Sequence, residues 1–135
     1  MSYQGECLCG AIKYEVDEIA NKIAHCHCTM CRKFHGAAYS TFAEAQIEHF
    51  RWLQGEALLK SYLADNSTTR QFCSQCGSSM TFSSAKNTGD TIEFALATLD
   101  SEITALPDAH IHVGSKVHWS IICDGLPHYN ADRDD

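Results

Sequence analysis

Three cysteines lie close together in HCHCTMCRKFHG, the segment of residues 25–36. The sulfurs of Cys26, Cys28 and Cys31 can converge on one point, and thiolates are good zinc ligands. Their C-x-C-x-x-C spacing leaves one position of a tetrahedral site without a local protein ligand. Structural zinc is usually closed by four protein ligands, whereas reactive zinc keeps three and leaves the fourth position for water or substrate. The spacing therefore predicts an open, catalytic-type zinc site.

Two further cysteine pairs lie far apart in the chain. Cys7 and Cys9 occur in ECLCG, and Cys73 and Cys76 occur in FCSQCG. Each pair supplies half of a tetrahedron, so the two pairs together predict a closed, structural four-thiolate zinc site.

The alternative for the three-cysteine cluster is a second closed structural site. Its fourth ligand would then be Cys123 or one of the histidines at positions 25, 27, 35, 110, 112 and 118. Each histidine alone is more often a core or surface residue than a ligand. His27 stands between two ligands, so we expect its side chain to point away from the metal.

Length and composition predict one domain over residues 1–135. The chain is 44% hydrophobic and has no linker-like tract or internal repeat. Its start, MSYQGECLCG, lacks the features of a signal peptide, and no apolar run reaches the roughly 20 residues that span a bilayer. We therefore expect a cytoplasmic protein without a membrane partner, in which clustered cysteines bind metal rather than form disulfides.

The net charge argues against nucleic acid as a partner. The formal charge is -7 with neutral thiols, and seven zinc-bound thiolates with two zinc ions would make the chain more negative still. Such a protein repels phosphate backbones. The sequence indicates no particular oligomeric state.

The pattern of the remaining residues is that of an all-β protein with at most short helical segments. Strands are expected at residues 11–16, 37–42, 47–53, 57–63, 79–82 and 91–99, with further short strands after residue 108. Thr29 is expected to cap a short helix that Gly36 ends. Gly10 and Gly77 should adopt positive φ in the two cysteine turns. Tyr62, Phe94, Trp119 and Cys123 are expected in the core.

The motifs together resemble one known family. C-x-C-G, C-H-C-x-x-C-R-K, F-C-x-x-C-G-S and H-I-x-V-x-S-K-x-x-W with D-G-L-P-x-Y follow one another between Gly5 and Tyr129. This order resembles the glutathione-dependent formaldehyde-activating enzymes, which include centromere-protein-V-like members. The resemblance implies an Mss4-like fold of several coiled antiparallel sheets stapled by zinc. It also implies a structural zinc on the four cysteines and a catalytic-type zinc on the three.

The resemblance implies a carbon–sulfur lyase that condenses formaldehyde with glutathione to S-hydroxymethylglutathione. Zinc held by three thiolates is a weak Lewis acid that suits a fourth sulfur ligand, so a small thiol is an expected substrate. The second substrate that the resemblance implies is a small aldehyde. Arg32 and Lys33 would attract the carboxylates of glutathione; alternatively they are solvated surface charges.

Two rival functions share the Mss4-like scaffold. A methionine sulfoxide reductase would need a reactive cysteine near the C-terminus, and Cys123, between Ile122 and Asp124, is the only candidate. A non-catalytic zinc module that binds a protein partner would need both metal sites only for its fold.

Overall fold

A computed structural model describes residues 2–133 as two β-sheets and one short α-helix. The strands are β1 (Tyr3–Glu6), β2 (Lys13–Val16), β3 (Ala24–Cys26), β4 (Ser40–Gln46), β5 (Phe50–Gln54), β6 (Leu59–Leu63), β7 (Thr69–Cys73), β8 (Ser79–Ser83), β9 (Thr91–Ala95) and β10 (Ala109–Ile111). The helix α1 spans Thr29–His35, and the 3-10 turns are η1 (Ile47–His49), η2 (Glu56–Leu58), η3 (Leu96–Thr98) and η4 (Val113–Ser115). The predicted mostly-β fold class is confirmed.

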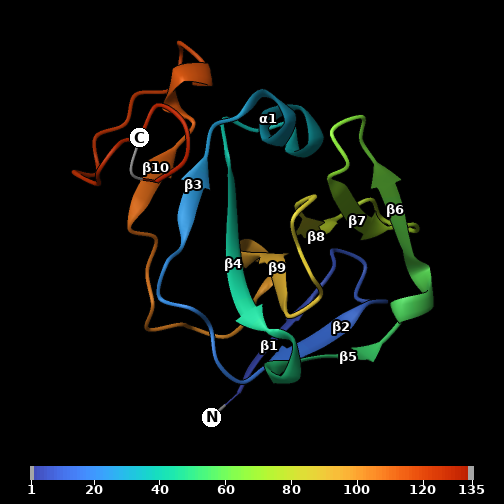
Figure 1. Cartoon of the computed structure of the whole chain (residues 1–135). Helices are drawn as coiled ribbons and strands as arrows, with labels where there is room; N and C mark the ends of the chain where they lie inside the picture. Colours follow the sequence, from blue (N-terminus) through green and yellow to red (C-terminus); the bar gives the residue numbers. More distant parts are fainter. Residues whose placement is uncertain (1, 134–135) are drawn as a thin grey trace.

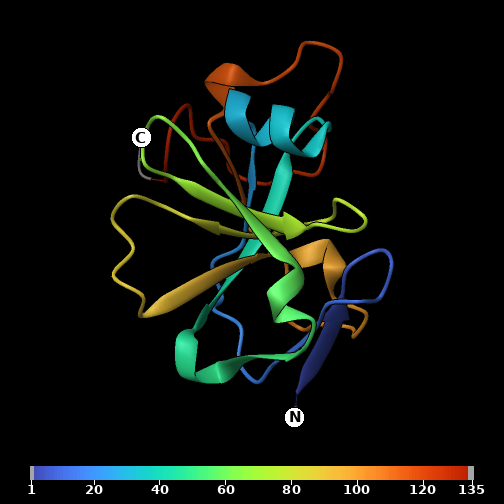
Figure 2. The ribbon, with the colours of Figure 1, turned by 90° about the vertical axis from the view of Figure 1, so that its right-hand side faces the viewer.

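The larger sheet has seven strands in the order β10-β3-β4-β9-β8-β7-β6, and the smaller sheet has the order β1-β2-β5. Every pairing between named strands is antiparallel except that of β10 with β3, which is parallel and therefore departs from the expected pattern. The smaller sheet lies at the end of the molecule opposite α1 (Figure 1). The segment after β10 lies at the α1 end, as the side view shows (Figure 2).

The core between the sheets is built around an aromatic cluster. Tyr14 stacks on Phe50 with ring centroids 5.1 Å apart, and it contacts Phe94 at 5.5 Å. Gly5 lets the Tyr14 ring approach the neighbouring strand, because a Cβ at this position would lie 2.5 Å from the ring. Burial of these rings contributes on the order of 2 kcal/mol each and joins the small sheet to the large one.

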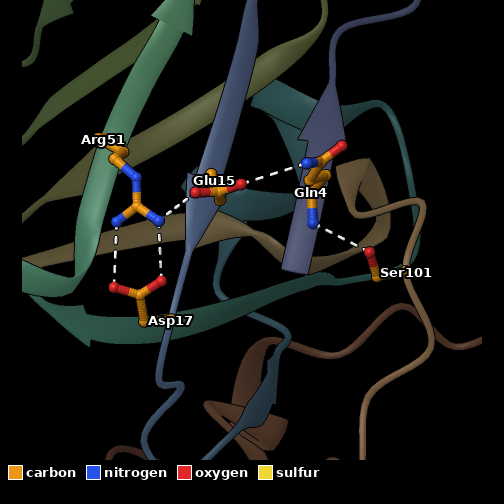
Figure 3. Close-up of polar contacts among 5 residues, drawn as sticks. All are labelled: Gln4, Glu15, Asp17, Arg51 and Ser101. Carbon is orange, nitrogen blue, oxygen red and sulfur yellow. Dashed lines mark hydrogen bonds and ion pairs between the residues drawn. The ribbon is translucent and has the colours of Figure 1, made fainter. Parts of the chain in front are cut away.

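An ion-pair network links the strands of the smaller sheet on its exposed face (Figure 3). Arg51 on β5 donates to both carboxylate oxygens of Asp17, at 3.0 and 2.8 Å, and also binds Glu15 on β2. Gln4 on β1 donates to Glu15 at 3.2 Å, and its backbone N–H donates to Ser101 at 2.9 Å. The network thus joins all three strands to the segment after β9.

Helix α1 begins at Thr29, one residue earlier than expected. Cys28, not Thr29, is the N-cap, and its sulfur accepts a hydrogen bond from the Cys31 backbone N–H at 3.2 Å. Gly36 ends the helix as predicted, in the left-handed region at φ 60°. A predicted metal ligand therefore also fixes the start of the helix.

Several expectations about strands near the C-terminus and about buried side chains are wrong. Residues 109–133 form only β10, η4 and one isolated bridge, between His110 and His128. The chain turns directly after β10, because the N–H groups of Ser115 and Lys116 donate to the carbonyls three residues earlier. Phe94 is buried as expected, but Trp119 and Tyr62 are 65% and 54% exposed, and Cys123 is also exposed.

Within residues 2–133, no helix is long and apolar enough to cross a membrane.

Candidate metal centres and the adjoining cavity

The first candidate centre brings together four sulfurs from two distant turns. Cys7, Cys9, Cys73 and Cys76 have all their sulfurs within 4.8 Å of one another. The sulfurs of Cys7 and Cys9 are 3.6 Å apart, and those of Cys9 and Cys73 are 3.9 Å apart. Four sulfurs at about 2.3 Å from a central zinc would be separated by about 3.8 Å. The donor set therefore fits one tetrahedral zinc ion.

Both turns of this centre have the backbone geometry of zinc-binding knuckles. Gly10 and Gly77 adopt the expected positive φ, 79° and 81°. Their N–H groups donate to the Cys7 and Cys73 carbonyls at 3.0 and 2.8 Å. The backbone N–H groups of Ile12 and Gln75 point at the sulfurs of the same two cysteines, at 3.3 and 3.4 Å. Such donors stabilise thiolates, which are the form that binds metal.

The second candidate centre arises from strand-like alternation in HCHC. Successive residues of an extended segment point to opposite faces. His25 and His27 pack on one face against Tyr39, with centroids 4.7 and 4.8 Å from its ring. Cys26 and Cys28 therefore face the other way, where their sulfurs and that of Cys31 lie within 4.8 Å of one another.

In the part of the chain that the structure describes, the three cysteines have no fourth protein ligand. Among residues 2–133, no histidine, carboxylate or further cysteine lies within ligand distance of the whole group. His27 instead forms a 2.8 Å hydrogen bond with His110, and exposed Cys123 belongs to neither cysteine group. Three thiolates with no fourth protein donor fit a zinc ion with one exchangeable position.

Arg70 is the nearest buried cation to this group. It is only 3% exposed, and its Nη2 lies 3.5 Å from the Cys31 sulfur. Its guanidinium lies 5.4 Å from the Phe34 ring centroid and 4.8 Å from that of Phe82, while Nε and Nη1 have no partner within residues 2–133. The thiols of Cys26 and Cys28 lower the pKa of Cys31 most, and Arg70 acts in the same direction.

The three cysteines line a cavity of about 580 Å³. Its wall also carries Arg70 and the carboxyls of Glu44 and Glu93, which are direct cross-strand partners on β4 and β9. Burial, followed by the charge of Glu44, raises the pKa of Glu93 to about 7. Glu93 is therefore able to give or take a proton near neutral pH. The four-cysteine group does not line this cavity.

Of the two cations expected to bind substrate, Lys33 lies beside a second cavity and Arg32 does not. Lys33 lines a cavity of about 500 Å³, which shares Met30, Asn66 and Arg70 with the first. Arg32 lines neither cavity, and its Nη2 donates to the Thr29 hydroxyl at 3.4 Å. The two cavities together thus lead from the cysteines toward Lys33.

Arg70, Glu44 and Glu93 were not identified from the sequence. Each is a charged residue inside a strand, in TRQFC, STFAEAQ and TIEFA. Alternation shows that such a residue points away from its apolar neighbours, but it does not show that three separate strands direct theirs into one cavity. The usable signal was clearest for Glu93, a charge at the centre of the otherwise largely apolar TIEFA.

Comparison with known proteins agrees with the motifs. The family model described as glutathione-dependent formaldehyde-activating enzyme matches residues 2–115, which confirms the predicted resemblance. A crystal structure of a Rhodobacter sphaeroides protein is similar, with a TM-score of 0.62 and 26% sequence identity, over 75% of this chain and 91% of that chain. The search of curated proteins found no match.

Proposed function

Because this chain belongs to the glutathione-dependent formaldehyde-activating enzyme family, we propose that it is a zinc-dependent carbon–sulfur lyase. The proposed reaction condenses formaldehyde with glutathione to S-hydroxymethylglutathione. One domain over residues 1–135 carries it out, with zinc-bound thiolates that suit a reducing, cytoplasmic compartment.

We assign two zinc ions to the chain. The structural ion is held by Cys7, Cys9, Cys73 and Cys76, and the catalytic-type ion by Cys26, Cys28 and Cys31. When bound at the three cysteines, zinc would supply a cation that holds an incoming sulfur as thiolate.

The observation that carries the proposal is that the group lacking a fourth ligand lines the 580 Å³ cavity. A structural site gains nothing from an exchangeable position beside a cavity, whereas a thiol-binding site requires one. The cavity also holds a cation and a titratable carboxyl, the two charge types that the addition of a thiol to an aldehyde uses.

The reaction needs one nucleophile and one proton donor. The glutathione thiolate attacks the carbonyl carbon of formaldehyde, so a carbon–sulfur bond forms while the carbonyl π electrons move to oxygen. The oxygen then takes a proton from the Glu93 carboxyl, and the proton lost by the thiol restores that carboxyl. Arg70 lowers the free energy of the developing negative charge on the oxygen and orients the Cys31 sulfur.

Glutathione is proposed to lie along the two joined cavities. Its sulfur would lie at the three cysteines, and its peptide part would extend past Met30 and Asn66 toward Lys33. Lys33 would pair with one carboxylate, and Arg32 would add positive charge on the same helix. The span suits a tripeptide better than a lone small thiol.

The test is the rate at which ¹³C-formaldehyde and glutathione interconvert with their adduct, measured by NMR exchange above the spontaneous rate. The zinc-loaded protein should accelerate both directions. Cys28→Ser should remove the acceleration, because it breaks the three-thiolate group.

Cys123→Ser is the matched control, since it removes an exposed thiol that lies in neither group. It should leave the acceleration unchanged. Equal rates for the wild type and Cys28→Ser, with the fold of both intact, would contradict the proposed reaction.

A further inference from the structure

The face of β3 opposite the three cysteines carries a third group of potential ligands. His25 on β3 and His110 on β10 are paired in register on adjacent parallel strands, with ring centroids 4.8 Å apart. The ligand atoms of His25, His110 and Asp124 all lie within 4.8 Å of one another. None of the three residues serves the proposed reaction.

We propose that His25, His110 and Asp124 form a binding site for a divalent first-row transition metal ion. Two imidazoles and one carboxylate are the donor set of the 2-His-1-carboxylate sites that bind Fe²⁺ and related ions and leave other positions open. Neither the family reaction nor the two cysteine sites requires this third site, so it stands independently of the proposed function.

In each of the three residues, the side-chain atom that is not the proposed ligand atom makes a hydrogen bond. Such bonds orient the ligands in established metal sites. His25 Nδ1 bonds the Thr41 hydroxyl at 2.7 Å, which leaves its Nε2 free. His110 Nδ1 bonds His27 Nε2 at 2.8 Å. Asp124 Oδ1 accepts from the Leu126 backbone N–H at 3.1 Å. His25 Nε2, His110 Nε2 and Asp124 Oδ2 are thus the atoms left to bind a metal ion.

The site is partly assembled and open to solvent on one side. His110 Nε2 and Asp124 Oδ2 are already 2.8 Å apart, close to the separation of about 3 Å between neighbouring ligands at metal–ligand distances of about 2.1 Å. His110 is buried, whereas the Asp124 side chain is 44% exposed. The Asp124 side chain can therefore shift to close the group around an ion that enters from solvent.

A purely structural interpretation explains less of this arrangement. A His110–Asp124 hydrogen bond alone would fasten the C-terminal segment to β10, but it would not need His25. The fixed orientation of His25 by Thr41 and its in-register position beside His110 are what a three-ligand site requires.

The experiment adds Co²⁺ to protein that already holds zinc at its cysteine sites and follows the absorption spectrum and bound cobalt per chain. The expected result is one equivalent of Co²⁺ with weak d–d bands and no sulfur-to-cobalt charge-transfer band, since the proposed ligands are nitrogen and oxygen. Asp124→Asn and His25→Gln should each weaken this binding at least about tenfold. His25 lies on β3, whereas Asp124 lies in the segment after η4, so one variant remains informative if the other does not fold.

His128→Gln is the matched control, because the His128 ring contacts that of His110 at 5.5 Å but lies outside the ligand group. It should bind Co²⁺ as the wild type does. The proposal is overturned if no cobalt binds, if cobalt appears only with sulfur charge-transfer bands, or if a folded Asp124→Asn or His25→Gln variant binds it with unchanged affinity.

Discussion

The two cysteine groups use the same atom type but differ in how the chain supplies it. Cys9 and Cys73, whose sulfurs lie 3.9 Å apart, are 64 residues apart in sequence. The other group comes from one short segment, residues 26–31, and closes no long loop. A metal at the first group therefore restricts much of the unfolded chain, whereas a metal at the second restricts only a local turn.

The surroundings of the two cysteine groups also differ. The four cysteines complete a tetrahedron among themselves, and two buried members, Cys7 and Cys73, receive backbone hydrogen bonds. The three cysteines instead line a cavity that contains Arg70 and Glu93. Ligand number and surroundings, rather than residue type, are what distinguish the proposed structural site from the proposed catalytic site.

The largest expected effect is that of Cys73→Ser. Because it removes a ligand that closes a long loop, zinc binding free energy that stabilises the fold is lost, and such losses can reach about 10 kcal/mol. We expect loss of the cooperative thermal transition in circular dichroism. A Cys73→Ser protein with the melting temperature of Cys123→Ser would abolish the distinction between the groups.

The second-largest expected effect is that of Glu93→Gln on the rate of the proposed reaction. The raised pKa of Glu93, about 7, keeps part of this carboxyl protonated at neutral pH, so proton donation should fall as pH rises above about 7. Removing it should slow the zinc-loaded enzyme about 100-fold and eliminate that alkaline limb. The pH profile of the NMR exchange rate measures both, and a variant that retains the limb would exclude Glu93 as the donor.

The structure groups the cysteines into four and three, the same grouping that the spacing suggests, while their roles as zinc ligands remain predictions. The spacing within each motif is a local property, and the two distant pairs are joined because each supplies half of a tetrahedron. Sequence reasoning also located most strands, Gly36 as the helix stop, and Gly10 and Gly77 in the cysteine turns. It did not identify Arg70 and Glu93, because strand pairing over long sequence distances brings them to the cavity. The errors at Trp119 and Tyr62 have a different cause: hydrophobicity favours burial, but the neighbouring elements leave both rings uncovered.

The smallest effect is expected at Arg51, far from the three cysteines in the fold. Its hydrogen bonds lower the pKa of Glu15 and Asp17 below their ordinary values of 4.5 and 3.8. This stabilisation is present above those values and is lost as the pH falls through the lowered ones. Arg51→Gln should therefore slightly reduce the melting temperature at pH 7, and the difference should vanish toward pH 2.

Arg51→Gln should not alter the zinc content or the exchange rate. A change in the zinc content or in the exchange rate would mean that the smaller sheet and the three-cysteine group are energetically coupled. The contrast between the two cysteine groups would then be incomplete.

The most direct test of the two-site account is zinc per chain, measured by native mass spectrometry with and without excess glutathione, for the wild type and Cys28→Ser. The account predicts two zinc ions in the wild type, with glutathione either bound to the zinc protein or removing one ion. It also predicts one zinc ion in a folded Cys28→Ser protein. Two zinc ions that neither bind nor respond to glutathione, together with an unfolded Cys28→Ser protein, would contradict it and would identify both groups as structural.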